Sequence, residues 1–267
     1  MKPSILGLVL ALAAGTAAGQ TPSSEQKPLG DYTLHEFAAK WMAAHDDLAE
    51  LARYRDANRA LTASADARPR VVLMGDSITF RWQPADLPPA PGLNLVNRGI
   101  PSQNTSQMLL RFEDDVIALK PAAVVIMGGT NDIRAYIGEP AAAGDAAVER
   151  VRRNVTAMAD IADARRVKVV LAAVPPIGET RRFNRDPTAV VKINAWLKAF
   201  AAERGYPFVD HFVSLAGADG ALPAGLSADG LHPNAAGYGR MRPGLGAALD
   251  GLRLTGGPAT ARSKAPR

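Results

Sequence analysis

Residues 71–79 read Val-Val-Leu-Met-Gly-Asp-Ser-Ile-Thr, a short apolar run closed by a glycine and followed by polar residues. The run is apolar throughout instead of alternating, which is typical of a parallel strand covered on both faces. Runs of the same kind occupy 124–127 and 167–174, and shorter candidates lie at Leu93 to Val96 and at Phe208-Val209. The sequence therefore predicts a sheet of short, buried, parallel strands.

Segments with helical periodicity separate these strands. Apolar residues recur at spacings of three, four and seven over 109–119, 148–161 and 191–200. Alternating strands and helices predict an α/β fold, a three-layer α/β/α sandwich around a parallel sheet. Upstream, residues 33–61 show the same spacing and are expected to be helical.

Ser77 lies where the first strand is expected to turn into a helix. A serine hydroxyl is a weak nucleophile unless a neighbouring base takes its proton. A strand-to-helix turn exposes such a side chain and offers backbone N–H groups to an oxyanion. The alternative is that Ser77 only caps the helix. The local pattern is not Gly-x-Ser-x-Gly, since Thr79 follows, and this disfavours a standard α/β-hydrolase.

His232 is the best candidate for the base that Ser77 requires. The chain has four histidines, of which His35 and His45 lie in the N-terminal helical segment and His211 is a weaker rival. His232 follows Asp229 by three residues, in a loop before a helix that is expected to start near residue 235. A carboxylate at that spacing can turn back onto the imidazole and fix its tautomer.

Asn131 is a candidate oxyanion donor. It lies in Gly128-Gly129-Thr130-Asn131-Asp132, directly after the second long apolar run. Its side-chain amide can donate a hydrogen bond to a developing oxyanion. The alternative is a simple turn, because these residue types all favour turns and caps. In open parallel sheets, ligands bind at the carboxyl ends of the strands, where Ser77 and Asn131 are both expected.

Four blocks of the sequence together resemble a known family. They are Gly75-Asp76-Ser77, the loop 97–102, Gly129-Thr130-Asn131-Asp132 and Asp229-Gly230-Leu231-His232-Pro233. In this order they resemble the blocks of SGNH (GDSL-type) hydrolases, over about residues 70–249. The resemblance implies a flavodoxin-like fold and hydrolysis of esters, often with acetyl or other short acyl groups, without a cofactor or metal. It also implies that Ser77 is the nucleophile, His232 the base and Asp229 its partner, with Ser77 N–H and Asn131 as oxyanion donors.

One position departs from the family pattern. The family's further oxyanion donor is the backbone N–H of a glycine, five residues after the asparagine that matches Asn97. Here that position is Ser102, preceded by Pro101. The N–H survives the change, so Ser102 can donate if a non-glycine residue accepts the local φ. Gly99 is the weaker substitute donor.

A subgroup resemblance is looser. The helical segment before the first block and Phe80-Arg81-Trp82 look most like bacterial platelet-activating-factor acetylhydrolase-like esterases. Trp82 is expected either to line the substrate pocket or to pack in the core.

Composition and charge limit the classes of function. The 267 residues are 47% hydrophobic and 21% charged, and none is cysteine, so disulfides and a cysteine nucleophile are excluded. The formal net charge is +5, but residues 251–267 carry Arg253, Arg262, Lys264 and Arg267 without an acid. A nucleic-acid binder should instead show a basic face on its folded part. We therefore expect a disordered basic tail and no nucleic-acid partner.

The N-terminus is typical of a signal peptide. Lys2 precedes an apolar run from Ile5 to Ala14, and small residues lead to a cleavage site near Gly19–Gln20. The run is shorter than the ~20 residues that span a bilayer, so no stable membrane anchor is expected. The predicted organisation is a signal peptide (1–19), a helical extension (20–69), an SGNH hydrolase domain (70–250) and the basic tail (251–267).

These expectations define an exported serine esterase, periplasmic or secreted, that cleaves small-molecule or glycan esters. Three alternatives stay open. The same machinery serves carbohydrate O-acetylesterases and lysophospholipases or thioesterases. A non-catalytic binding module on the same fold is supported only by the Ser102 departure.

Overall fold

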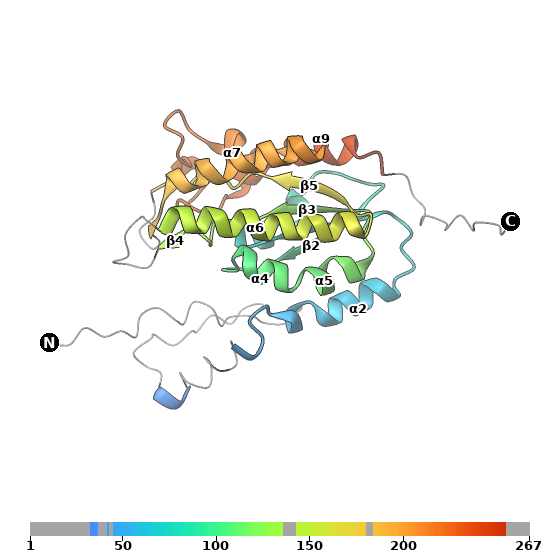
Figure 1. The fold of residues 1–267 in the computed structure, drawn as a ribbon. Helices are drawn as coiled ribbons and strands as arrows, with labels where there is room; N and C mark the ends of the chain where they lie inside the picture. The colour runs from blue at the N-terminus through green and yellow to red at the C-terminus, as the bar shows by residue number, and fades with distance from the viewer. Residues whose placement is uncertain (1–32, 37–41, 43–44, 136–142, 180–183, 255–267) are drawn as a thin grey trace.

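The computed structural model describes residues 33–36, 42, 45–135, 143–179 and 184–254 (Figure 1). At its centre lies a five-stranded parallel sheet in the order β2-β1-β3-β5-β7. The strands are β1 (Arg70–Gly75), β2 (Asn94–Gly99), β3 (Ala123–Met127), β5 (Lys168–Ala172) and β7 (Phe208–Val209). Numbered within the sheet alone, this order is 2-1-3-4-5, the doubly wound flavodoxin-like order. The predicted fold class is confirmed.

The continuous apolar runs arise because both faces of the sheet are covered. In β1, Val72 and Met74 belong to one hydrophobic cluster, whereas Val71 and Leu73 belong to another on the opposite face. Strand β3 repeats this division. Successive side chains of a strand point to opposite faces, so two cores require apolar residues at every position.

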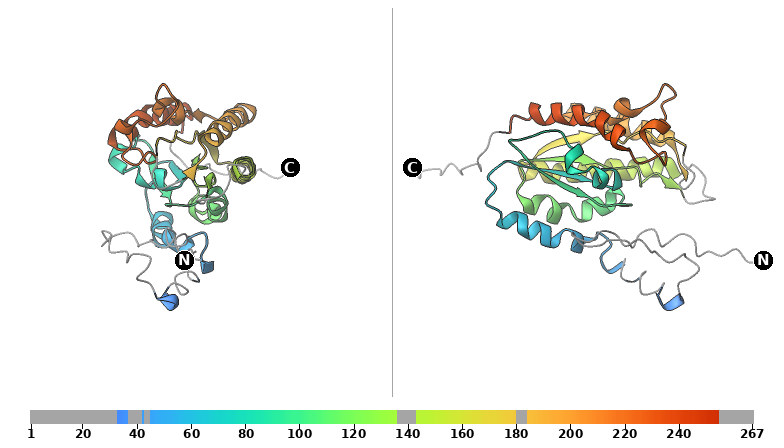
Figure 2. Two further views of the ribbon diagram at one scale, coloured as in Figure 1. Left: turned by 90° about the vertical axis from the view of Figure 1, so that its left-hand side faces the viewer. Right: turned by 180° about the vertical axis from the view of Figure 1, so that it is seen from behind.

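Helices form the outer two layers. They are α3 (Ser77–Arg81), α4 (Thr105–Leu110), α5 (Phe112–Asp115), α6 (Ala143–Ala164), α7 (Pro187–Arg204), α8 (His211–Leu215) and α9 (Ala235–Gly251). Short 3-10 turns complete the layers at η5 (Pro84–Asp86), η6 (Ile117–Leu119) and η7 (Ala224–Leu226). Helices α4 to α7 cover one face, and α3, α8 and α9 cover the other (Figure 2).

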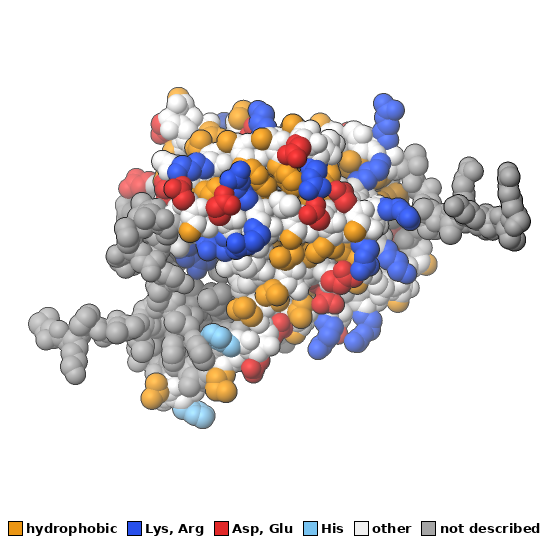
Figure 3. Space-filling model, in the orientation of Figure 1, with side chains coloured by type: hydrophobic (Ala, Val, Ile, Leu, Met, Phe, Trp, Pro, Cys, Tyr) orange, Lys and Arg blue, Asp and Glu red, His pale blue; other side chains and the backbone are white. Residues whose placement is uncertain are grey.

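The helices predicted over 148–161 and 191–200 are confirmed as parts of α6 and α7. Side chains of both signs are mixed on the outer face of this pair (Figure 3). Ion pairs link the helices, among them Lys192–Asp145 at 2.6 Å and Arg204–Asp160 at 2.8 Å.

The helix expected over 109–119 is instead three short pieces, α4, α5 and η6. The first break falls at Arg111, whose side chain is fully buried. Its guanidinium turns inward and donates to the Gly75 carbonyl at 2.9 Å and the Arg98 carbonyl at 2.8 Å. The spacing of apolar residues indicates only the apolar face of a helix, so it cannot predict that a buried arginine interrupts the helix.

The helix expected over 33–61 is likewise interrupted. Asp47 accepts the backbone N–H groups of Leu51 and Ala52, and Glu50 adopts a left-handed φ of 54°. A new start follows, with η4 (Leu51–Arg53) and then α2 (Arg55–Ala63). Such local side-chain bonds compete with helix continuation. Helix α2 lies along α5, and Asn58 Nδ2 donates to Asp115 Oδ1 at 2.7 Å.

Two further strands form a small antiparallel ribbon of their own, β4 (Arg134–Ala135) and β6 (Asn184–Arg185). Within the described ranges, no helix has the length and apolar character needed to cross a membrane. The predicted signal peptide (1–19) and the tail beyond residue 254 lie outside the described residues.

Candidate active site

The register of the sheet brings three predicted site residues to one edge. Gly75 at the end of β1 pairs with Gly99 of β2 and Met127 of β3. Ser77, Ser102 and Asn131 follow these three strand ends within a few residues. They therefore lie at the carboxyl edge of the sheet, beside the point where the strand order reverses.

Ser77 is the first residue of α3 and is 9% exposed. The cap of this helix is Asp76, whose side chain accepts the Ile78 N–H at 2.9 Å. Ser77 is therefore not the cap, and its hydroxyl has a different partner.

That partner is His232, in the loop before α9. The distance from His232 Nε2 to Ser77 Oγ is 2.9 Å, and that from His232 Nδ1 to Asp229 Oδ2 is 2.7 Å. A carboxylate can only accept, so Nδ1 carries the proton and Nε2 is left to accept from the serine hydroxyl. This chain of contacts has the geometry of a nucleophile, a base and an orienting carboxylate.

The Asp229 carboxylate is held by its own loop. Oδ1 accepts the backbone N–H groups of Leu231 at 3.0 Å and His232 at 2.8 Å, and the Ser227 hydroxyl at 3.2 Å. Burial tends to raise the pKa of Asp229, but the bonds from His232 and Leu231 outweigh it and hold the pKa below its ordinary value. Asp229 is therefore ionised and fixed behind the imidazole.

The electrostatics of His232 favour the neutral base. Burial lowers the pKa of His232, the Asp229 bond opposes this shift, and the positive charges of Arg81 and Arg185 reinforce it. The net pKa lies below 6.5. A neutral imidazole at pH 7 is ready to take the Ser77 proton.

Asn131 presents its amide with a defined orientation. Arg134 Nη2 and Arg185 Nη2 each lie 3.0 Å from Oδ1, and Nδ2 donates to the Gln103 carbonyl at 3.0 Å. A guanidinium only donates, so the atom that faces both arginines is the oxygen. One hydrogen of Nδ2 binds Gln103, and among the described residues no hydrogen-bond partner takes the second, which an oxyanion could accept.

Ser102 adopts a left-handed conformation with φ 67°. This is the region that glycine occupies freely and that strains other residues. The structure thus retains a glycine-like backbone at this position. The loop is held on both sides of Ser102. The Ile100 N–H donates to the Gly75 carbonyl at 3.0 Å, and the Gln103 carbonyl accepts a hydrogen bond from Asn131 Nδ2.

Two buried arginines at the site were not predicted. Arg111 links the ends of β1 and β2 and also binds Gln103 Oε1 at 2.6 Å and Asp115 Oδ2 at 3.0 Å. Arg185 is 7% exposed and reaches the site from β6. Neither lies in a motif. The only signal for Arg111 is its place between Leu110 and Phe112, which is equally typical of a solvated helix face, and Arg185 lies among polar residues that give no signal.

The rival residues pack in the core. His211 is 1% exposed, and burial lowers its pKa to about 3. Its ring packs edge-on against Trp82, which also stacks on Tyr238 with ring centroids 5.5 Å apart. Trp82 is 3% exposed and donates to the Asp86 carbonyl, so the core alternative for Trp82 is the correct one.

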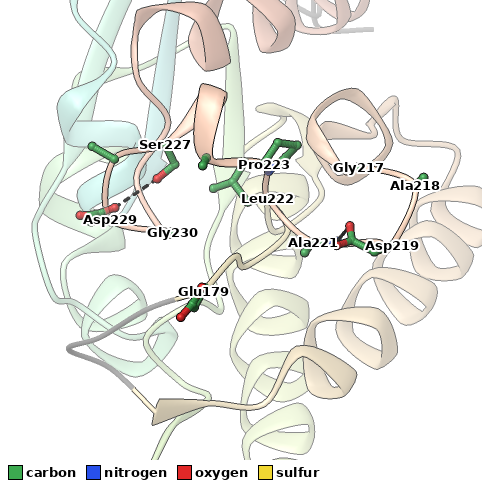
Figure 4. A pocket seen from close by; sticks show the side chains of 12 residues that line it. Glu179, Gly217, Ala218, Asp219, Ala221, Leu222, Pro223, Ser227, Asp229 and Gly230 are labelled. Atoms are coloured by element: carbon green, nitrogen blue, oxygen red, sulfur yellow. Dashed lines mark hydrogen bonds between the residues drawn. The ribbon is translucent and has the colours of Figure 1, made fainter.

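A cavity of about 1010 Å³ adjoins the acid end of this arrangement. Residues 217–219, 221–224 and 227–230 line it together with Glu179, and Asp229 and Ser227 form one wall (Figure 4). Ser77 is not among its lining residues. Among the described residues, no group of three or more His, Asp or Glu side chains is arranged to hold a metal ion.

Comparison with known proteins identifies the family. The sequence profile of the GDSL-like lipase/acylhydrolase family matches residues 73–240, which hold Ser77, Ser102, Asn131, Asp229 and His232. The chain belongs to this family. GDSL-like acylhydrolases act on esters, so small-molecule esters are the substrate class.

Solved structures agree. A GDSL-like lipase from Bacteroides thetaiotaomicron VPI-5482 is 33% identical, with a TM-score of 0.65 over 76% of this chain and 98% of that one. A proposed acylhydrolase from Bacteroides fragilis NCTC 9343 is 34% identical, with a TM-score of 0.65 over 77% and 98%. A protein described as a platelet activating factor from Streptococcus pneumonia shares the fold at 22% identity and a TM-score of 0.60, over 81% of this chain and 99% of that one. A search of curated proteins gives no match.

Proposed function

We propose that this GDSL-family acylhydrolase is an exported serine esterase that cleaves carboxylic esters of short acyl groups, acetyl above all. Ser77 is the nucleophile, His232 the base and Asp229 the orienting acid. The observation that carries the proposal is the unbroken contact from Ser77 Oγ through both nitrogens of His232 to Asp229, at 2.9 and 2.7 Å.

The first half of the reaction acylates the enzyme. As Ser77 Oγ attacks the ester carbonyl carbon, its proton moves to His232 Nε2, and the carbonyl oxygen becomes an oxyanion. The Ser77 and Ser102 N–H groups and Asn131 Nδ2 stabilise that oxyanion. The C–O bond then breaks, and His232 returns the proton to the departing alcohol.

The second half releases the acid. Water gives a proton to His232 Nε2 as its oxygen attacks the acyl-enzyme carbonyl, and the same donors hold the second oxyanion. The bond to Ser77 Oγ breaks, and Ser77 recovers its proton from His232. Asp229 keeps its negative charge throughout and stabilises the imidazolium that forms in each half.

Export is the remaining part of the proposal. The basic Lys2, the apolar run from Ile5 to Ala14 and the small residues up to Gly19 support it. An exported esterase meets its substrates outside the cytoplasm.

The test is hydrolysis of p-nitrophenyl esters by the wild type and by Ser77→Ala. The wild type should hydrolyse p-nitrophenyl acetate, with a rate that falls from C2 to C12 acyl chains, and Ser77→Ala should lose at least a thousandfold in kcat. Ser214→Ala is a matched control, since the Ser214 hydroxyl donates to the carbonyl of Asp210, the N-cap of α8. Equal rates in wild type and Ser77→Ala would refute the assignment, and a maximum at long chains would refute the short-acyl specificity.

A further inference from the structure

Two arginines converge on the amide of Asn131. Strands β4 and β6 pair so that Arg134 stands directly opposite Arg185. Their Nη2 atoms both donate to Asn131 Oδ1 at 3.0 Å. The ribbon thus directs two positive charges at one neutral oxygen.

The two positive charges of the ribbon repel each other, whereas the charges of Asp76 and Asp229 act on Arg185 in the opposite sense. Like charges directly opposite each other across an antiparallel pair are destabilising. Arg185 is also 7% exposed, and burial together with the charge of Arg134 lowers its pKa to about 10.

The contacts of each arginine converge on the loops of the proposed oxyanion hole. Arg185 Nε donates to the Thr130 carbonyl at 2.9 Å, next to Asn131 in the chain. Arg134 Nη2 also lies 3.4 Å from the Ser102 carbonyl. The two side chains therefore join the loops that carry Asn131 and Ser102.

The effect on Asn131 is both steric and electronic. Two donors on Oδ1 exclude the flipped amide, because Nδ2 in that place would face two cations. They also draw electron density from the amide, which strengthens Nδ2–H as a donor, as bonds in a chain polarise one another. An oxyanion formed there would meet a donor that is already oriented and polarised.

The geometry points to Arg134 and Arg185 as positioning residues that orient and polarise the Asn131 amide for the oxyanion. This inference rests on the proposed function, since it assigns a role within the same site. Both residues come from the β4–β6 ribbon. They act through Asn131 and do not contact the reacting atoms.

A double-mutant cycle tests the inference. Arg185→Met should lower kcat for p-nitrophenyl acetate about ten- to a hundredfold with KM changed less than threefold, and Arg134→Met should act in the same sense. In an Asn131→Ala background, Arg185→Met should cost less than threefold further, because its effect passes through Asn131. Arg204→Met, at the end of α7, is the control arginine and should leave kcat unchanged.

Arg185→Lys separates charge from geometry. Lysine keeps the positive charge but lacks the fork that binds Thr130 and Asn131 together, so kcat should stay well below the wild type. The inference would be overturned if Arg185→Met lowered kcat as strongly in the Asn131→Ala background as in the wild type. It would also be overturned if Arg185→Met alone had the kcat of the wild type. If the wild type itself fails to exceed Ser77→Ala, the proposed function fails instead.

A crystal structure of Arg185→Met gives a readout that does not depend on activity and also reveals a misfolded variant. The inference predicts that the Asn131 side chain rotates or takes two orientations once one of its anchors is lost. A single orientation identical to that described here would contradict it.

Discussion

Ser102 shows at the residue scale how the site tolerates a departure from its family's pattern. Its φ of 67° lies where glycine is the usual occupant. The backbone holds this conformation although the side chain strains it, because the loop is bonded to Gly75 through Ile100 and to Asn131 through Gln103. The backbone N–H that we propose as an oxyanion donor is retained, and the residue carries local strain.

Replacement of Ser102 by glycine should therefore relieve strain and leave the chemistry intact. Removing the strain of a non-glycine residue at a left-handed φ adds about 1 kcal/mol to the free energy of unfolding. The greater entropy of glycine in the unfolded chain subtracts part of this gain. We expect the free energy of unfolding to rise by up to about 1 kcal/mol in urea titrations, with kcat within threefold of the wild type. Ser102→Ala, which keeps both strain and N–H, should match the wild type in both measurements. A tenfold loss of kcat in Ser102→Ala would show that the hydroxyl, not the N–H, is what the site uses.

The charge state of His232 predicts the pH dependence of the reaction. Protonated His232 cannot accept from Ser77, and its pKa lies below 6.5 because of burial and the charges of Arg81 and Arg185. The profile of kcat/KM should rise with pH and bend at an apparent pKa below that of an ordinary histidine. In Arg81→Gln one of the lowering charges is gone, so the bend should move to higher pH. A bend above pH 7 in the wild type would contradict this assignment.

Asp76 predicts a pH dependence of stability. Burial raises its pKa from 3.8 to about 6, against the opposing bond from Ile78. A carboxyl whose folded pKa is raised stabilises the fold at low pH and loses that contribution as the pH climbs from about 4 to about 6. The unfolding free energy of Asp76→Asn relative to the wild type should rise over that interval by about 1–3 kcal/mol. A relative stability that stays constant from pH 4 to pH 7 would show that Asp76 is not shifted.

At the scale of elements, the N-terminal extension clamps the loop that carries Ser102. The Tyr54 hydroxyl donates to the Gly99 carbonyl at 2.6 Å, and Gln103 Nε2 donates to the Ala49 carbonyl at 2.8 Å. Gln107 Nε2 adds a bond to the Leu48 carbonyl at 2.9 Å. Residues 48–54 lie outside the matched family region and yet hold one wall of the proposed oxyanion hole.

Loss of the Tyr54 hydroxyl should loosen this clamp. Tyr54→Phe leaves the Gly99 carbonyl without a donor from the extension, which costs about 1–2 kcal/mol of unfolding free energy. We also expect kcat to fall severalfold, since Ser102 follows Gly99 closely. Tyr206→Phe is the matched control, because its hydroxyl binds Asp163 at an exposed position and its loss should cost under about 0.5 kcal/mol. Equal effects of the two variants on kcat would refute a role for the clamp.

Elements with a strong periodic signal could be predicted from the sequence, and elements set by a single side chain could not. Strands β1, β3 and β5 and helices α6 and α7 follow from apolar spacing, because burial on one or both faces dictates it. The break at Glu50 depends on one carboxylate, Asp47, and the break at Arg111 on one buried guanidinium. In the sequence, these two residues cannot be distinguished from charged residues on the surface.

The same division holds for the site. Ser77 and Asn131 follow strand ends, so sheet topology brings them to one edge, and the Asp–x–x–His spacing predicts the contact between Asp229 and His232. Arg134 and Arg185 meet there through a two-residue ribbon without apolar alternation. The wall formed by residues 217–230 depends on loop conformation, which the sequence pattern does not encode.

The whole molecule is organised around one edge of its sheet. Four segments from 77 to 232 contribute to that edge, and the two hydrophobic clusters fix the strands that carry them. The cavity beside Asp229 opens at the same end, where residues 217–230 meet Glu179 (Figure 4).

The proposed export makes a prediction for the full chain. Signal-peptidase cleavage near Gly19 should yield a mature protein that begins at or beside Gln20. Intact-mass measurement of protein from the periplasm or medium of a bacterial host should give that mass. Leu10→Arg interrupts the apolar run and should keep the full-length chain inside the cell. Full-length wild-type chain confined to the cytoplasm would contradict export.

The central claim is that Ser77 is activated by His232, and a fluorophosphonate probe tests it most directly. We predict one phosphonyl adduct per chain, located at Ser77 by peptide mass spectrometry and formed at least a hundredfold more slowly in His232→Ala. Absence of the adduct from the folded wild-type protein, or its attachment to another serine, would contradict the account.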